Sequence, residues 1–125
     1  MKIKVNTGNI KMWLETINTF NSTPDFGTTR VLFTDEEVKA REYVKSEMRK
    51  LNLQVHEDAI GNIFGVLKGT RPELPPVWTG SHIDTVLNAG MFDGMSGVVA
   101  GLEAVRLIQV NKLKHERSIV VVVYT

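Results

Sequence analysis

Apolar residues recur at helical spacing in two segments of the amino-terminal half of the chain. The first segment has apolar side chains at offsets 0, 3, 4 and 7 and predicts an amphipathic helix, with Asn6 or Thr7 as its cap. The second has them at offsets 0, 3, 4, 8 and 11 and predicts a longer helix that starts after Thr34. The two apolar stripes are Ile10, Trp13, Leu14 and Ile17, and then Ala40, Tyr43, Val44, Met48 and Leu51.

The residues that flank these stripes predict a helix cap, a solvated face and a loop. Thr34 and Glu37 form a capping-box pattern, in which the threonine hydroxyl bonds to first-turn amides and the glutamate reaches back. Residues 21–27 are predicted to be a loop, and we expect Phe26 and Phe33 to pack in the core, with a position near a substrate as the alternative. The charged residues of the second helix are predicted to form a solvated face. They are Lys39, Arg41, Glu42, Lys45, Glu47, Arg49 and Lys50.

Apolar runs in the second half of the chain predict β-strands. Residues 53–55 alternate, residues 63–67 follow, and together they predict a β-hairpin whose turn places Gly61 and Asn62 in left-handed conformations. Residues 119–124 form a continuous β-branched run, which is typical of a strand buried on both faces of a parallel sheet.

A strand, a helix and the final strand predict one crossover unit. Residues 77–79 are a short apolar strand, and residues 94–108 form a helix that is apolar nearly all round, so we expect it to be buried on more than one side. Gly97 and Gly101 would allow this helix to approach a neighbouring backbone closely. A right-handed crossover makes the two strands parallel, which predicts an α/β fold. Their carboxyl ends then open on one crevice.

Candidate chemistry lies directly after the strand at residues 77–79. His82 and Asp84 are separated by one residue, so in an extended segment they project to the same side, about 6.5–7 Å apart. Asp93 follows a loop of small residues that can turn the backbone back toward them. Zinc and manganese accept this mixture of imidazole and carboxylate ligands. The alternative is an ordinary strand end followed by a polar turn.

Composition restricts the class of protein. The chain has 125 residues, enough for one domain with a core, and its 42% hydrophobic and 23% charged residues are ordinary for a soluble globular protein. Fifteen basic and fourteen acidic residues are interspersed, which gives a nucleic-acid partner no electrostatic support. The absence of cysteine leaves histidine and carboxylates as the only metal ligands. With no apolar run long enough for a membrane span and no signal sequence, we expect a cytoplasmic protein without a membrane partner.

The motif residues resemble those of a known family. Gly80-Ser81-His82-Ile83-Asp84-Thr85, with Phe92-Asp93-Gly94 and Gly97, is similar to the first metal motif of the amidase, hydantoinase/carbamoylase family, a branch of the aminoacylase-like dinuclear metallopeptidases. Asp58, Gly61-Asn62 and Gly65 are similar to its hairpin. The resemblance implies the amino-terminal part of a three-layer α/β/α zinc-peptidase-like catalytic domain with a mixed sheet.

The resemblance also implies roles for the three candidate residues. It makes His82 a ligand of one metal ion, Asp93 the carboxylate that bridges two divalent ions (zinc or manganese), and Asp84 the catalytic-site residue that bonds to His82 and fixes its tautomer. The implied reaction is hydrolysis of a C–N bond in an N-carbamoyl amino acid or another small ureido or amide substrate. The implied intact protein is a homodimer.

Residues 1–125 are expected to be an inactive fragment of such an enzyme, because the family's paired glutamates, later histidine ligands and dimerisation domain are not found among them. The alternatives are a non-enzymatic remnant or partner-binding module of the same fold, and an aminoacylase-like metallopeptidase. As a fragment, the valine-rich final strand is expected to expose an unpaired edge and to promote self-association.

Overall fold

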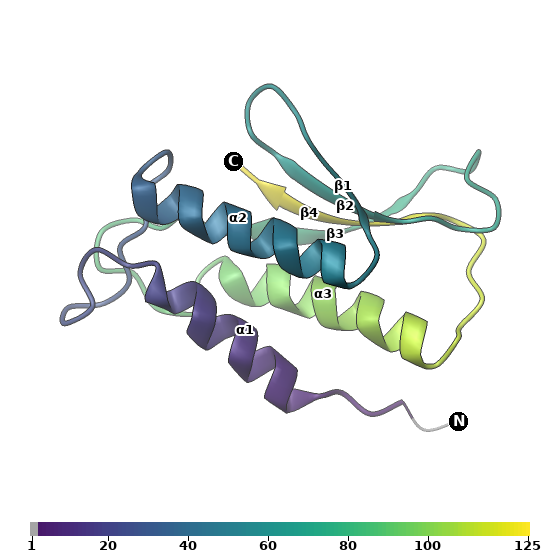
Figure 1. The fold of residues 1–125 in the computed structure, drawn as a ribbon, viewed down its shortest axis with the longest axis horizontal. Helices are drawn as coiled ribbons and strands as arrows, with labels where there is room; N and C mark the ends of the chain where they lie inside the picture. The colour runs from purple at the N-terminus through teal and green to yellow at the C-terminus, as the bar shows by residue number, and fades with distance from the viewer. Residues whose placement is uncertain (1–2) are drawn as a thin grey trace.

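The valine-rich final strand lies inside the sheet. The computed structural model describes residues 3–125 (Figure 1), and in it β4 (Ile119–Tyr124) belongs to a four-stranded sheet of order β1-β2-β4-β3. It pairs in parallel with β3 (Val77–His82) and antiparallel with β2 (Ile63–Leu67), and β2 pairs antiparallel with β1 (Gln54–Glu57). The mixed sheet confirms the predicted α/β class and the parallel crossover.

The prediction that the final strand has a free edge is wrong. Residues Ile119–Val123 of β4 pair with β2, and all six residues of β4 pair with β3. The edges of this sheet are β1 and β3, and on β3 the side chains of Val77 and Trp78 are each half exposed. In the described sheet β4 therefore offers no free edge for self-association, because its valines are buried in the middle of the sheet.

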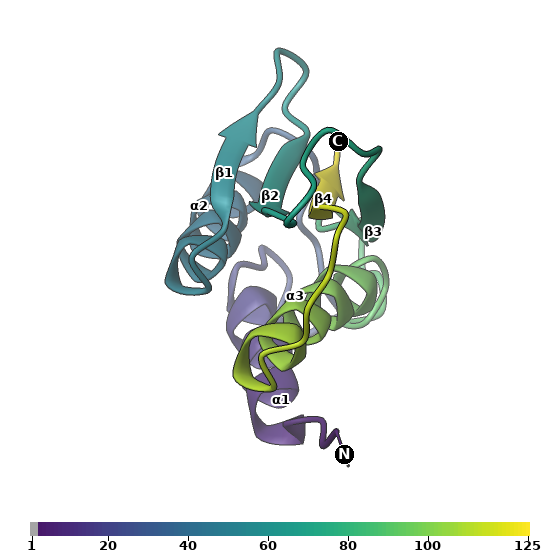
Figure 2. The same ribbon diagram turned by 90° about the vertical axis from the view of Figure 1, so that its right-hand side faces the viewer.

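Three helices cover one face of the sheet: α1 (Thr7–Thr19), α2 (Asp35–Lys50) and α3 (Met95–Val110). In Figure 2 the strands run side by side above the helices, with α2 beneath β1 and β2 and α3 beneath β4 and β3. Cross-strand partners point to the same face of a sheet, and here Gly65 of β2 faces Met48 of α2 while its partner Val121 faces Gly101 of α3. Helix α1 packs on α2 and α3.

The predicted close approach of α3 to the sheet is confirmed. A Cβ atom added at Gly97 would lie 2.6 Å from Cβ of Ser81, and one added at Gly101 would lie 3.1 Å from Cγ1 of Val121. The two glycines therefore bring the helix backbone down onto β3 and β4. This contact fixes where the first turn of α3 lies relative to the end of β3.

The predicted helix stripes are confirmed, whereas two of the charged residues are not on a solvated face. The side chains of Arg41 and Glu47 are buried. Glu47 accepts a hydrogen bond of 2.9 Å from the indole Nε1 of Trp13, and Arg41 lies 2.8 Å from Oε1 of Glu57 and 3.2 Å from Oε1 of Glu37. Periodicity alone misses such burial, since Trp13 and Glu57 come from other elements.

The predicted cap of the first helix is confirmed. At the second helix the predicted capping hydrogen bonds are wrong. Asn6 Oδ1 accepts a 3.1 Å bond from the backbone N of Asn9, as a cap residue should. At the second helix, the Thr34 hydroxyl donates 2.6 Å to the carbonyl of Val31 and caps no amide of the helix. Glu37 does reach back, but one residue further than the pattern predicts, to the backbone N of Phe33 at 3.2 Å.

The prediction that Phe26 and Phe33 are core residues is wrong. Their exposed fractions are 79% and 68%, and Phe33 has a positive φ of 65° in the turn that leads into α2. The buried part of this connection is polar instead and comprises Thr28, Thr29 and Arg30. The hydrophobic residues of the loop thus face outward while its polar residues turn inward to bond with the chain after β3.

The β-hairpin is confirmed with a different turn. Gly61 has a positive φ of 104°, but Asn62 does not share it. The carboxylate of Asp58 accepts hydrogen bonds from the backbone N atoms of Gly61 and Asn62, at 2.9 and 2.8 Å, and these bonds close the turn. On the sheet face away from the helices, an apolar groove of about 380 Å³ runs past Phe64 and Trp78.

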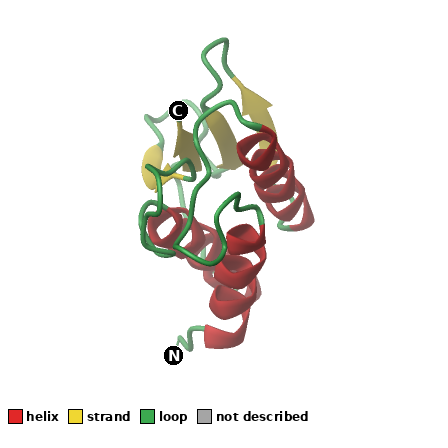
Figure 3. Ribbon diagram, turned by 90° about the vertical axis from the view of Figure 1, so that its left-hand side faces the viewer, coloured by secondary structure: helices red, strands yellow, loops and turns green. Residues whose placement is uncertain are grey.

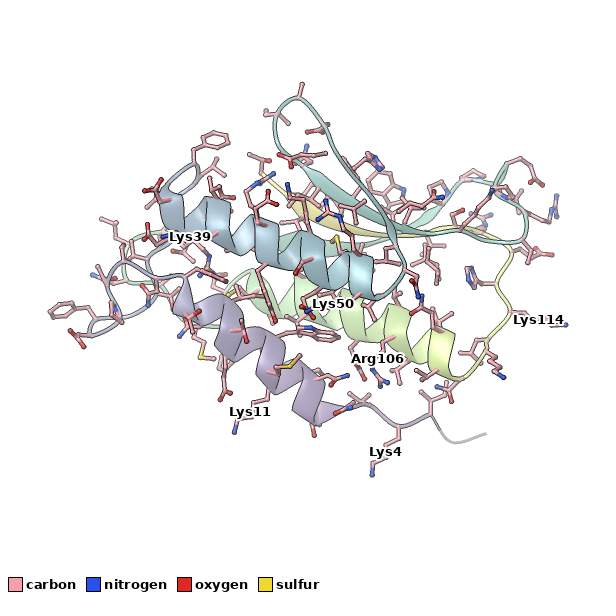
Figure 4. All side chains as sticks on the ribbon, viewed as in Figure 1. Lys4, Lys11, Lys39, Lys50, Arg106 and Lys114 are labelled. Carbon is pink, nitrogen blue, oxygen red and sulfur yellow. The ribbon has the colours of Figure 1, made fainter. Side chains whose placement is uncertain are left out.

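The charge distribution agrees with the composition. The cationic side chains labelled in Figure 4 come from different helices and loops and form no single stripe. Within residues 3–125, every helix falls short of the length and hydrophobicity that a membrane crossing needs.

Candidate active site

The end of β3 brings His82 and Asp84 into contact. His82 is the last residue of β3, and its ring Nδ1 lies 3.3 Å from Oδ1 of Asp84 and 2.9 Å from the backbone oxygen of Asp84. Both of these atoms are acceptors, so in the neutral ring the proton belongs on Nδ1, which leaves the lone pair of Nε2 free. The pair is partly exposed, with 40% of the His82 side chain and 31% of the Asp84 side chain accessible.

Asp93 is the first residue of a tight turn that packs against the His82 ring. The backbone N of Met95 donates 2.8 Å to the carbonyl of Asp93, and Gly94 between them has φ 72° and ψ −51°, which is a γ-turn of positive φ. A Cβ atom on Gly94 would lie 2.5 Å from Cε1 and 2.6 Å from Nδ1 of the His82 ring. The turn therefore packs directly against the imidazole, and the Asp93 side chain beside it is exposed.

The loop between the pair and the turn is fastened to the segment after α1. Thr28 and Ala89 form an isolated antiparallel bridge with backbone bonds of 2.9 and 2.8 Å, and the hydroxyl of Thr29 accepts a 2.8 Å bond from the N of Asn88. A Cβ on Gly27 would lie 2.9 Å from the Asn88 backbone, so only glycine allows this approach. Figure 3 faces the end of the molecule where these loops lie.

Arg30 and Thr85 form the buried base of the site, and sequence reasoning missed both. The backbone N of Arg30 donates 2.8 Å to the Thr85 hydroxyl, the N of Thr85 donates 2.8 Å to the Arg30 carbonyl, and the Arg30 side-chain Nε donates 2.7 Å to the Ile83 carbonyl. Burial lowers the pKa of the Arg30 guanidinium, which the negative charges of Glu37 and Asp84 partly offset. An arginine in a loop carries no sequence signal of such burial, because its partners are distant carbonyls.

The three predicted residues do not form a closed metal site by themselves. Among residues 3–125 the structure brings together no group of three or more histidine and carboxylate side chains that could hold an ion. What it does present is a ring nitrogen with a free lone pair at the end of β3, and an exposed carboxylate at Asp93 in the turn that packs on the same ring. This donor set suits zinc or manganese, so the residues present fit part of such a site.

Comparison with known proteins places these residues in a family context. The sequence model of Peptidase family M28 matches residues 62–125, which include His82, Asp84 and Asp93. Ureidoglycolate hydrolase of Arabidopsis thaliana is 39% identical over 123 residues, which cover 98% of this chain and 26% of that protein. N-carbamoyl-L-amino-acid amidohydrolase of Paenarthrobacter aurescens is 51% identical over 85 residues, which cover 68% of this chain and 21% of that protein.

The fold shows the same relationship. A hydantoinase/carbamoylase family amidase from Burkholderia ambifaria superimposes with a TM-score of 0.94 at 30% identity, over 98% of this chain and 30% of that one. The chain spans about a quarter of the length of the curated relatives it matches. Sequence and fold agree with these relatives over nearly the whole chain, and the model of Peptidase family M28 matches its second half, so the chain belongs to the hydantoinase/carbamoylase family of amidases and matches Peptidase family M28.

Proposed function

We propose that this chain supplies part of the active site of a metal-dependent amidohydrolase that cleaves C–N bonds in N-carbamoyl amino acids or related ureido compounds. The observation that carries the proposal is the orientation of the His82 ring, whose Nδ1 is engaged by Asp84, whose Nε2 is left free, and against which the turn at Gly94 packs. Relatives that are hydrolases of ureidoglycolate, carbamoyl amino acids and allantoate support the substrate class.

In this proposal two divalent ions, zinc or manganese, are held in the complete site. His82 and Asp93 would hold the ions, and Asp84 would keep the proton on Nδ1 of His82 so that Nε2 stays basic. When bound, such ions acidify water and polarise the scissile carbonyl. The contribution of these three residues is to place one imidazole and one carboxylate at fixed positions before substrate binds.

The proposal includes that the remaining ligands lie outside residues 3–125. Two observations support this: the described part of the chain brings no three histidine and carboxylate side chains together around an ion site, and the chain spans about a quarter of its curated relatives. It follows that residues 1–125 by themselves should be inactive, and that the small ureido or amide substrate and a homodimeric state belong to the intact protein.

The test is a calorimetric titration of the 125-residue chain with zinc and with manganese at neutral pH. Weak binding to the wild-type chain is expected, and His82→Ala and Asp93→Asn should each weaken it by at least about tenfold. His56→Ala is the matched control, because His56 is an exposed histidine on β1. Equal loss of binding in His56→Ala and His82→Ala would show that the ion binds to surface histidines and would contradict the proposed site.

The same preparation is assayed for release of ammonia from an N-carbamoyl amino acid. No turnover is expected, and turnover above background that disappears in His82→Ala would show that a complete site forms in this chain. Zinc binding too weak to detect, with the His82 geometry intact, would favour a non-enzymatic module of the same fold.

A further inference from the structure

Arg30 is a buried cation whose partners surround the candidate site. Its side chain is 0% exposed, and within residues 3–125 no carboxylate lies within salt-bridge distance of its guanidinium. The group is instead satisfied by three backbone carbonyls and one thioether sulfur. Nε donates to Ile83 O at 2.7 Å, Nη1 donates to Ile17 O at 3.0 Å and Phe20 O at 2.8 Å, and Nη2 lies 2.9 Å from Met95 Sδ.

Two of these partners adjoin the candidate ligands. The carbonyl of Ile83 belongs to the peptide between His82 and Asp84, so the Nε bond fixes the plane of that peptide. Met95 is the first residue of α3 and follows the Asp93–Gly94 turn directly, with its backbone N bonded to Asp93 O at 2.8 Å. One rigid guanidinium therefore contacts both the residue after His82 and the residue after the Asp93–Gly94 turn.

The other two partners anchor the arginine. Ile17 and Phe20 lie at the carboxyl end of α1, where the last carbonyls carry the negative end of the helix dipole, although the Ile17 carbonyl also accepts a 3.2 Å bond from the backbone N of Phe20. A planar cation with five donors in a fixed geometry suits this position better than a lysine would. Burying a charge is costly unless it is well bonded, so a purely packing role would be met as well by an apolar side chain.

We propose that Arg30 is a positioning residue for the site: it holds the His82–Asp84 segment and the Asp93 turn in fixed relation and so keeps the His82 ring in its Nδ1-protonated, Nε2-free form. The consequence of this role for metal binding rests on the function proposed above. The effect of Arg30 on the orientation of the His82 ring does not depend on that function. Without the Nε bond, the Ile83–Asp84 peptide can rotate and move the Asp84 side chain, with its acceptor Oδ1, away from the ring, whereas the backbone bond from Thr85 N to Arg30 O still restrains the Asp84 carbonyl.

The test observes the His82 ring nitrogens directly by two-bond ¹H–¹⁵N correlation spectroscopy on the metal-free 125-residue chain. The measurement is made at about pH 8, where an ordinary histidine is neutral. The wild-type chain should show the Nδ1-protonated tautomer. Arg30→Met, similar in length but without donors, should lose this preference and show mixed tautomers, and Arg30→Lys should recover it only in part.

Val105→Ala is the control for lost stability, because Val105 is fully buried on α3 and is not among the partners of Arg30. It should unfold more easily than wild type yet keep the wild-type His82 pattern. The inference is overturned if Arg30→Met keeps the wild-type pattern, or if Val105→Ala loses it as well. If Arg30→Met fails to fold, Arg30→Lys is compared with Val105→Ala instead. A wild-type His82 tautomer pattern in both variants then overturns the inference.

A parallel zinc titration of the same variants separates this inference from the proposed function. Zinc binding that is absent from the wild-type chain, together with tautomer loss in Arg30→Met, would leave Arg30 as the positioning residue and count against the metal site. Zinc binding at His82 that is unchanged in Arg30→Met, with an unchanged tautomer, would retain the metal site and reject the role of Arg30.

Discussion

Replacing Gly94 with alanine should disturb both the stability of the fold and the orientation of His82. At φ 72° and ψ −51° an alanine is strained, which costs about 1–3 kcal/mol. The new Cβ would also lie 2.5 Å from both Cε1 and the backbone O of His82, and the repacking that this overlap forces costs about 1–3 kcal/mol more. We therefore expect Gly94→Ala to lose about 2–6 kcal/mol of unfolding free energy.

Urea unfolding and thermal melting measure the stability loss, and the ring resonances of His82 report its orientation. At roughly 4 °C per kcal/mol for a domain of this size, the melting temperature should fall by about 8 °C or more. Gly90→Ala is the matched control, because its φ is not positive and a Cβ there meets no atom within 4 Å. A Gly94→Ala protein within about 0.5 kcal/mol of wild type, with His82 resonances unmoved, would refute the described packing of the turn on the imidazole.

Two further predictions concern buried carboxylates. Glu47→Ala leaves the buried indole N–H of Trp13 without its acceptor and should cost about 1–3 kcal/mol in urea unfolding; a cost no larger than that of the exposed Glu42→Ala would contradict it. The hydrogen bonds from Arg106 lower the pKa of Glu103, so its contribution to stability is present above about pH 4.5 and is lost as the pH falls through the lowered pKa. Melting from pH 7 to pH 2 should therefore show a shallower acid limb for Glu103→Gln, and a limb identical to wild type would show that this ion pair adds nothing.

The elements that sequence predicts well are those whose signal is local. The valines of β4, the stripe of α2 and the glycines of α3 each reflect contacts made along one element at its own period, and the structure confirms them. The position of β4 between two strands was missed, since strand order depends on which distant segment pairs with β2. For the same reason the charged residues Arg41 and Glu47 are buried against the expectation of their helix pattern.

The candidate site shows the same limit. The approach of the Asp93 carboxylate to the pair stays a prediction, whereas the contact of His82 with Asp84 could be predicted from their spacing. Arg30 and Thr85 could not, because their bonds join the loop after α1 to the chain after β3, and neither segment has a periodic pattern. Phe26 and Phe33 point outward for the same reason: the polar residues of this loop are turned inward, and the loop cannot turn both sets of side chains inward.

The central place of β4 also bears on how the described fold assembles. The β1–β2 hairpin with α2, and β3 with α3, are two groups of elements whose strands touch only through β4. Because loop-closure entropy must be overcome before such distant strands pair, completion of the described sheet waits for the strand that follows the other three along the chain. Backbone amides of β4 should accordingly be among the slowest to exchange with solvent. They exchange only when the hydrogen bonds that join β4 to β2 or to β3 break, and both halves of the sheet depend on those bonds.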